Sequence, residues 1–166
     1  MRKVVANTTP LIALSDIGQL ELLKDLYGEI FIPQAVMEEI ESEPARSMVM
    51  NAEWIKKVLI EGADKKNMFK ARLHAGEVEA IILAEESKAD LIIMDDYAAK
   101  KTAKYLGYNV TGTLGVLIKA KAEGYVEKIE PLIKLLIDDG LYIDQKTKEL
   151  ALEKAGEGGH YVRAEH

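Results

Sequence analysis

The sequence contains no cysteine among its 166 residues. This absence excludes disulfide bonds, thiolate metal sites and a cysteine nucleophile, and it fits a reducing compartment. No apolar run approaches the roughly 20 residues that a membrane-spanning helix needs. The residues after Met1 also lack the long apolar segment of a secretion signal. We therefore expect a cytoplasmic protein with no membrane partner.

An excess of basic residues is also missing. The chain has 22 lysines and arginines against 28 aspartates and glutamates, which gives a formal net charge of −6. Proteins that hold nucleic acid by charge alone are usually basic, so this composition counts against a simple electrostatic binder. It does not exclude a nuclease, because a metal site lined by carboxylates is itself acidic and its cations reverse the local field.

Short apolar segments alternate with amphipathic ones along most of the chain. Hydrophobic residues make up 48% of the sequence, enough for one buried core. The segments expected as strands are 3–7, 29–33, 52–62, 90–96 and 108–112. The segments expected as helices are 10–18, 19–28, 33–43, 76–89, 96–107 and 112–124. This alternation predicts an α/β fold, a three-layer α/β/α arrangement with a mostly parallel twisted sheet.

The last part of the chain has a different pattern. Residues 1–125 are expected to form the α/β domain, and residues 126–155 a C-terminal helical appendage of the same domain, because strand patterns stop there. Residues 156–166 lack apolar periodicity and are expected to be a flexible tail. The most polar segment, 64–76, is expected to be a loop or a short amphipathic helix.

Polar side chains stand where two expected strands end. Asn7 ends the first strand, and Asp95 and Asp96 end the strand at 90–96. In an open α/β sheet the functional crevice lies at the carboxyl ends of the strands. The helices could add carboxylates from Glu38, Glu39, Glu77 and Glu79. Converging carboxylates raise one another's pKa unless a cation holds them, and oxygen ligands suit Mg²⁺ or Mn²⁺. Such a site could activate a water for phosphodiester cleavage.

Each of these acids also has a structural interpretation. Helix capping or the helix dipole would account for Asp96, Glu77 and Glu79, and simple surface exposure for Glu38 and Glu39. The case for chemistry rests most on Glu79. Apolar residues lie three and four positions after it, on a helix that is apolar around most of its circumference. A carboxylate buried there needs a partner or a cation.

Five motifs follow one another in a recognisable order. They are VVANTTPLIAL at 4–14, IPQAVMEEI at 32–40, HAGEVEAIILA at 74–84, LIIMDDYAAKKTAKYLG at 91–107 and VTGTLGVL at 110–117. Together they resemble the PIN-domain ribonucleases, especially the toxins of the virulence-associated-protein-C type. The chain is also similar to a PIN-like branch of predicted nucleic-acid-binding proteins. The resemblance covers about three quarters of the chain. It implies a doubly wound, mostly parallel sheet and a cluster of acids that holds Mg²⁺ or Mn²⁺.

The resemblance also implies which residues form the site. The four acid positions of the family fall on Asn7, Glu39, Glu79 and Asp96, with Asp95 as an alternate for the last. The first four are the expected metal ligands, and all five are the expected catalytic residues. The hydroxyl residues that follow the first acid match Thr8 and Thr9.

Asn7 is the departure from the family pattern, which has aspartate at this position. An amide oxygen can ligate Mg²⁺, but it is neutral and cannot hold a proton, and cation affinity follows the charge of the ligands. Three interpretations stay open. The chain is a working nuclease with a weakened ligand, a catalytically reduced or inactive RNA-binding or protein-interaction module, or a protein in which asparagine was introduced to remove toxicity.

Three residues near the acid positions are candidates for contacting RNA, namely Thr8, Thr113 and Lys100. Capping is the simpler role for Thr113, and a solvated helix face is the simpler role for Lys100. The resemblance implies single-stranded RNA as the substrate, a small helical antitoxin protein as a partner, and a homodimer. The prediction is a metal-dependent endoribonuclease-like toxin that hydrolyses RNA with metal-activated water. The alternative is the inactive module.

Overall fold

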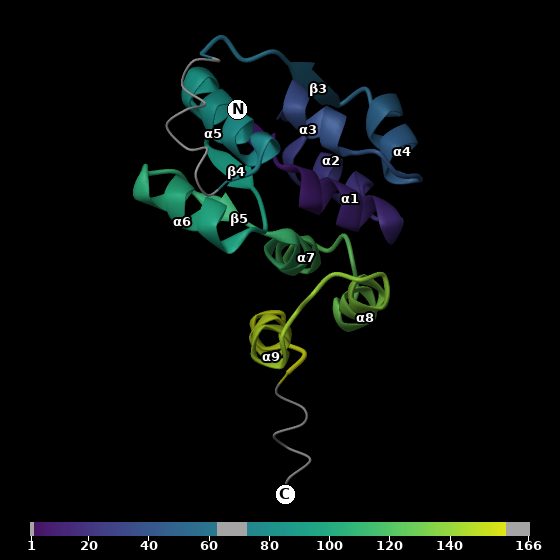
Figure 1. Ribbon diagram of the computed structural model, residues 1–166. Helices are drawn as coiled ribbons and strands as arrows, with labels where there is room; N and C mark the ends of the chain where they lie inside the picture. The colour runs from purple at the N-terminus through teal and green to yellow at the C-terminus, as the bar shows by residue number, and fades with distance from the viewer. Residues whose placement is uncertain (1, 63–72, 159–166) are drawn as a thin grey trace, which may run out of the picture.

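A single parallel sheet lies at the centre of the part of the chain that the structure describes. The computed structural model describes residues 2–62 and 73–158 (Figure 1). The strands of these residues are β1 (Val4–Ala6), β2 (Ile30–Pro33), β3 (Ile55–Val58), β4 (Leu91–Ile93) and β5 (Val110–Thr111). They lie in the order β3-β2-β1-β4-β5, and every pair is parallel. The predicted sheet is therefore confirmed. Strands β2 and β3 lie on one side of β1, and β4 and β5 lie on the other side.

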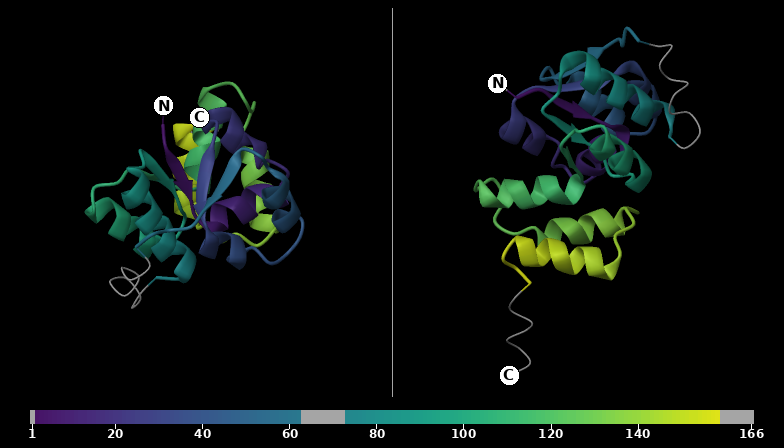
Figure 2. Two further views of the ribbon diagram at one scale, coloured as in Figure 1. Left: turned by 90° about the horizontal axis from the view of Figure 1, so that it is seen from above. Right: turned by 90° about the vertical axis from the view of Figure 1, so that its left-hand side faces the viewer.

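Helices cover both faces of this sheet (Figure 2). They are α1 (Thr8–Asp16), α2 (Glu21–Tyr27), α3 (Gln34–Glu39), α4 (Ala45–Asn51), α5 (Ala75–Ser87), α6 (Tyr97–Tyr105), α7 (Thr113–Ala122), α8 (Glu130–Asp138) and α9 (Gln145–Lys154). Val4 and Ala6 of β1 pack with α1, α2, α4 and α7 on one face, and Val5 packs with α5 and α6 on the other. Alternate residues of a strand point to opposite faces, so one short strand serves two cores. The three-layer α/β/α prediction is confirmed.

Several element boundaries differ from the sequence prediction. Helix α1 begins at Thr8, two residues before the expected start at Pro10, because Asn7 is extended and takes the N-cap position. Pro10 fits inside the first turn, whose N–H groups have no partner within a helix. Helix α4 was not predicted. Only Ala45 and Val49 of it are buried, which leaves too few apolar positions to make a helical pattern.

Helices α8 and α9 lie in the segment that the sequence predicts to be a C-terminal helical appendage. Helix α9 packs on α7, and α8 packs on α1 (Figures 1 and 2). Ile133 and Leu136 of α8, with Ala151 and Leu152 of α9, join the larger core. No helix within the described ranges combines the length and apolar character of a membrane span. Most of the polar segment 64–76, and residues 159–166 of the expected tail, lie outside the described residues.

Glu157 joins the segment after α9 to the start of α8. Its carboxylate accepts hydrogen bonds from the backbone N–H of Ile129 at 2.7 Å and of Glu130 at 3.0 Å, and from Lys121 Nζ at 2.9 Å. The Glu157 side chain is only 8% exposed. Burial by itself would raise the pKa of Glu157, but these donors outweigh it and lower the pKa. The carboxylate therefore satisfies N–H groups that the first turn of α8 leaves unpaired.

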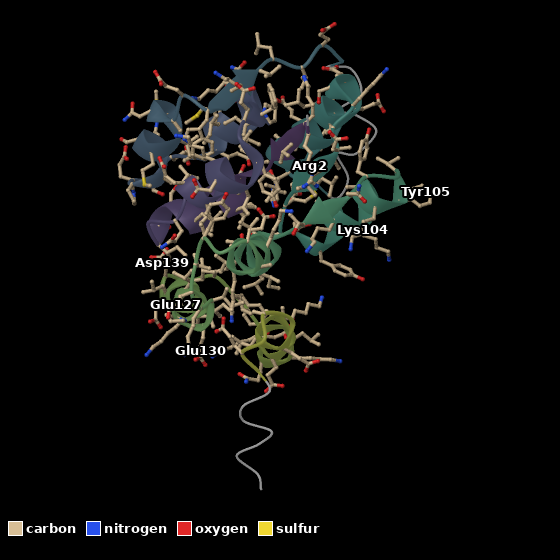
Figure 3. All side chains as sticks on the ribbon, turned by 180° about the vertical axis from the view of Figure 1, so that it is seen from behind. Arg2, Lys104, Tyr105, Glu127, Glu130 and Asp139 are labelled. Carbon is tan, nitrogen blue, oxygen red and sulfur yellow. The ribbon has the colours of Figure 1, made fainter. Side chains whose placement is uncertain are left out.

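Replacing Glu157 with glutamine should lower the free energy of unfolding by about 1–2 kcal/mol at neutral pH. The lowered pKa means that the charged form stabilises the fold above the usual glutamate pKa of 4.5 and that this contribution is lost as the pH falls through the folded-state value. Urea unfolding at several pH values measures the difference. Glu127→Gln is the control, because Glu127 is exposed near the start of α8 (Figure 3). An equal loss in both variants would contradict the role given to Glu157.

Candidate metal centre

The ends of β1 and β4 lie side by side. Ala6 pairs with Ile93 in the parallel register, and the backbone N–H of Asn7 donates to the Ile93 carbonyl at 2.8 Å. Asn7 is therefore next to the point where the chain leaves β4 toward Asp95. The strand order switches from one side of β1 to the other at this place, and open α/β sheets bind ligands at such a point.

Asn7 holds an unsatisfied oxygen at this edge of the sheet. The residue is 3% exposed, and no donor among the described residues reaches its buried Oδ1 atom. A buried acceptor without a partner costs about 1–3 kcal/mol. Folded proteins rarely leave a buried acceptor without a partner, and a hard cation is one partner that this oxygen could bind.

Glu39 contacts Thr8, the residue that follows Asn7 in the chain. The Thr8 hydroxyl donates to Glu39 Oε1 at 2.7 Å, and the Gly76 N–H donates to Glu39 Oε2 at 2.8 Å. A Cβ atom at Gly76 would collide with the Glu39 carboxylate and lie 3.0 Å from Thr8 Oγ1. Glycine at position 76 therefore allows α5 to begin directly against this carboxylate. The first turns of α1 and α5 and the end of α3 meet at Glu39.

The two glutamates of α5 have different surroundings. Both are 6% exposed. Glu77 accepts a hydrogen bond from the His74 N–H at 3.0 Å, in a capping box at the start of the helix. Burial raises the pKa of Glu77, and the charges of Asp96 and Glu39 raise it further. Glu79 accepts a hydrogen bond from the Ala35 N–H of α3 at 3.0 Å.

These surroundings bear on the roles that the sequence predicted for the two glutamates of α5. The sequence interpretation that a buried Glu79 needs a partner is supported, since the backbone of α3 supplies one. Glu77 lies close enough to Asp96 and Glu39 for their negative charges to add to the rise in its pKa that burial causes. The sequence marked Glu77 as a candidate carboxylate but did not place it in the ligand set. The signal was its position three residues after His74, which is the spacing of a capping box.

The two aspartates after β4 each cap a helix. Asp96 is the N-cap of α6 and accepts from the Ala99 N–H at 3.0 Å. Asp95 accepts from the Thr113 N–H at 2.7 Å and from the Thr113 hydroxyl at 2.6 Å, at the start of α7. The capping interpretation of Asp96 is therefore present in the structure. Thr113, expected to be a cap itself, instead uses its hydroxyl to hold Asp95.

Lys100 lies on the same side of the sheet edge. It is half-buried on α6, and a Cβ atom at Gly112 would lie 3.3 Å from its Nζ atom. Its ammonium group is thus close to the backbone where α7 begins. Lys104 projects farther along α6 at the surface (Figure 3).

The residues present suit a divalent cation by their chemistry, although their carboxylates are turned toward the protein. Among the described residues, no three acidic, histidine or cysteine side chains are arranged to hold a metal ion together. Five of the six acids that the sequence singled out accept a hydrogen bond from a backbone N–H, namely Glu39, Glu77, Glu79, Asp95 and Asp96. The donor set consists of oxygen atoms, and the unpaired Asn7 Oδ1 fits a hard cation such as Mg²⁺ or Mn²⁺.

A comparison with protein families identifies the fold. The family model DUF3368, described as a PIN domain, matches residues 3–157. The chain belongs to this PIN-domain family. The family match spans the whole sheet and both C-terminal helices, and it confirms the resemblance at the level of the PIN domain. Searches of curated proteins and of solved structures found no match. The fold is therefore that of a nuclease-like PIN domain.

Proposed function

We propose that this PIN domain is a metal-dependent endoribonuclease that hydrolyses single-stranded RNA and is the toxin of a toxin–antitoxin pair. PIN domains indicate a nuclease-like, RNA-binding function and generally depend on divalent metal ions. The observation that carries the proposal for this chain is the buried, unpaired Asn7 Oδ1 at the sheet edge. It lies next to Thr8, whose hydroxyl holds the Glu39 carboxylate.

The proposed cation ligands are Asn7, Glu39, Glu79 and Asp96. When bound, Mg²⁺ or Mn²⁺ supplies a water of lowered pKa and positive charge for the leaving oxygen. The hydrogen bonds from Thr8 and Gly76 hold both oxygens of Glu39 in a fixed orientation. This fixed orientation favours activity, because a displaced carboxylate would weaken both the binding of the cation and the positioning of the RNA.

Neighbouring residues have supporting roles in this proposal. Thr113 fixes Asp95 by two hydrogen bonds, which keeps the Asp95-Asp96 turn in place. Lys100 provides a positive charge near that turn and would contact an RNA phosphate. Thr8 and Thr113 are further candidates for RNA contact through their hydroxyl oxygens, which keep acceptor capacity after donating to Glu39 and Asp95.

The proposal is tested by incubating the chain with labelled single-stranded RNA and Mn²⁺. We expect cleavage that requires the ion and stops when EDTA is added, because the ligand set has no other source of activated water. Gel analysis of the RNA and calorimetric titration of Mn²⁺ are the two measurements. A duplex RNA of the same sequence is the control and should stay intact. The nuclease proposal fails if neither this chain nor Asn7→Asp cuts RNA or binds Mn²⁺.

A second candidate function follows from the neutral charge of Asn7. With one carboxylate fewer, and with the remaining acids already bonded to backbone N–H groups, the chain could bind RNA or a protein without turnover. Cleavage that appears only in Asn7→Asp would support this alternative. Strong Mn²⁺-dependent turnover by the chain as it stands would exclude it.

The remaining parts of the proposal concern partners. The resemblance to virulence-associated-protein-C toxins supports a small helical antitoxin, a homodimer and a cytoplasmic location. Exposed apolar side chains on the C-terminal helices offer contact surface for such partners, namely Leu135, Ile137 and Leu150. A small helical protein encoded beside this one would support the toxin assignment over general RNA processing.

A further inference from the structure

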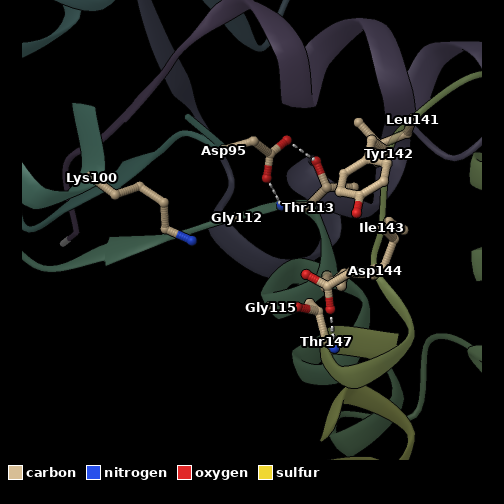
Figure 4. Close-up of a pocket in the computed structure, with 11 residues that line it drawn as sticks. Asp95, Lys100, Gly112, Thr113, Gly115, Leu141, Tyr142, Ile143, Asp144 and Thr147 are labelled. Carbon is tan, nitrogen blue, oxygen red and sulfur yellow. Dashed lines mark hydrogen bonds between the residues drawn. The ribbon is translucent and has the colours of Figure 1, made fainter. Parts of the chain in front are cut away.

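A groove separates the start of α7 from the segment that joins α8 to α9. It has a volume of about 250 Å³, and its walls include Asp95, Lys100, Thr113, Tyr142 and Asp144 (Figure 4). Asp95 and Lys100 come from the candidate metal centre, whereas Tyr142 and Asp144 come from the C-terminal extension. The groove therefore continues the candidate centre toward α9, and neither the family's acid positions nor the metal ligands account for it.

The residues on either side of Tyr142 hold its side chain at the surface of the protein. It is 85% exposed, while Leu141 and Ile143 on either side pack against the larger core. The segment is fastened at both ends, by the Leu141 N–H donating to the Leu136 carbonyl at 3.0 Å and by Asp144 accepting from the Thr147 N–H at 2.7 Å. An exposed aromatic ring on a segment fastened in this way can offer a face for stacking.

The groove carries different chemistry at its two ends. Lys100 extends across one end toward Gly112, and the Tyr142 ring lies at the other beside Thr113 (Figure 4). Asp95 and Asp144 also line the groove and add carboxylate oxygens that can accept hydrogen bonds. A lysine ammonium group can bind a phosphate, and an aromatic ring can stack on a base. A carboxylate can accept a hydrogen bond from an amino group of a base or from a ribose hydroxyl. The arrangement matches one nucleotide of an RNA strand.

We propose that this groove is a nucleotide subsite, in which Tyr142 stacks on one base of a single-stranded RNA while Lys100 contacts its phosphate. The proposal rests on the proposed function, because the RNA strand is the one that reaches the candidate metal centre. The volume is below the 300–1,000 Å³ typical of drug-sized ligand pockets, which suits a single base. The carboxylates on its walls disfavour a free polyphosphate, so the occupant is a nucleotide within a strand.

The test measures binding of a fluorescently labelled single-stranded RNA to the full chain by anisotropy, in EDTA so that no RNA is cut. Tyr142→Ala should weaken binding about tenfold, within the range of about 5- to 150-fold that loss of one base–aromatic stack produces. Tyr142→Trp should bind as tightly as the unaltered chain or more tightly, because it keeps the stacking face. Tyr125→Ala is the matched control and should change nothing, because Tyr125 is a partly exposed tyrosine beyond the opposite end of α7.

The outcomes separate this inference from the proposed function. If the unaltered chain binds RNA and Tyr142→Ala binds equally well, the subsite is overturned and the ribonuclease proposal stands. Equal weakening by Tyr142→Ala and Tyr142→Trp also overturns stacking at this position. If the unaltered chain neither binds RNA in EDTA nor cuts it with Mn²⁺, both proposals are overturned. Selective weakening by Tyr142→Ala alone supports the subsite.

Discussion

Replacing Asn7 with aspartate is expected to raise Mn²⁺ affinity and the rate of RNA cleavage by at least about tenfold. The change adds a negative charge at an atom that is buried and has no hydrogen-bond donor among the described residues. Two opposite unit charges 4 Å apart attract by about 4 kcal/mol in a partly screened site, and the attraction to a divalent cation is about twice that, before the cost of burying the carboxylate. Since that cost removes part of the gain, a tenfold effect is the lower bound we expect.

The same substitution should have the opposite effect when no metal is present. A carboxylate that is buried near Glu39 has its charged form disfavoured by burial and by repulsion, so its pKa rises. We therefore expect Asn7→Asp to unfold at a lower temperature than the unaltered chain in EDTA and at a higher one in saturating Mn²⁺. This reversal is a readout of the ion that does not depend on catalysis.

Thermal unfolding and Mn²⁺ titration calorimetry measure these effects, alongside cleavage of the labelled RNA. Asn51→Asp makes the same chemical change at an exposed position and should show neither the reversal nor the gain in Mn²⁺ affinity. Equal stability of Asn7→Asp and the unaltered chain under both conditions, together with equal Mn²⁺ affinity, would exclude Asn7 as a ligand position.

The sequence predicted part of the placement of Asn7. Alternating apolar segments predicted a parallel sheet, and polar residues directly after two strands would share a crevice if those strands were neighbours. The pattern did not give the strand order, and the structure shows that β1 and β4 are neighbours.

The surroundings of Glu77 and Glu79 could not be predicted in the same way. These residues are two positions apart on α5, so their side chains leave the helix in nearly opposite directions. On an amphipathic helix the apolar stripe would show which one points to the core. Here the residues from Gly76 to Ala84 are all buried, so the pattern holds no such information. The groove at Tyr142 was missed for a related reason, because the packing of Leu141 and Ile143 decides its exposure.

Glu39→Gln is expected to reduce RNA cleavage by at least about a hundredfold while leaving the protein folded. The carboxylate accepts one hydrogen bond from the Thr8 hydroxyl and one from the Gly76 N–H. Glutamine can keep both contacts, because its carbonyl oxygen accepts from Gly76 and its NH₂ group donates to the Thr8 oxygen, which can also accept. The change therefore removes the charge and preserves the shape. Loss of a charged cation ligand should cost more than the 10–100-fold typical of residues that only orient a ligand.

Single-turnover cleavage of labelled RNA with Mn²⁺, together with Mn²⁺ titration, measures the effect of Glu39→Gln. If the unaltered chain cuts slowly, the comparison is made in the Asn7→Asp background. Glu38→Gln is the matched control, since Glu38 is the adjacent glutamate on α3, is exposed and accepts a hydrogen bond from Gln34 Nε2 at 2.8 Å. The control should cleave at the rate of its parent. A Glu39→Gln protein that melts at the parent temperature and still cuts at the parent rate would remove Glu39 from the ligand set, and the charge at the sheet edge would then have to come from Glu77, Glu79 or the Asp95-Asp96 turn.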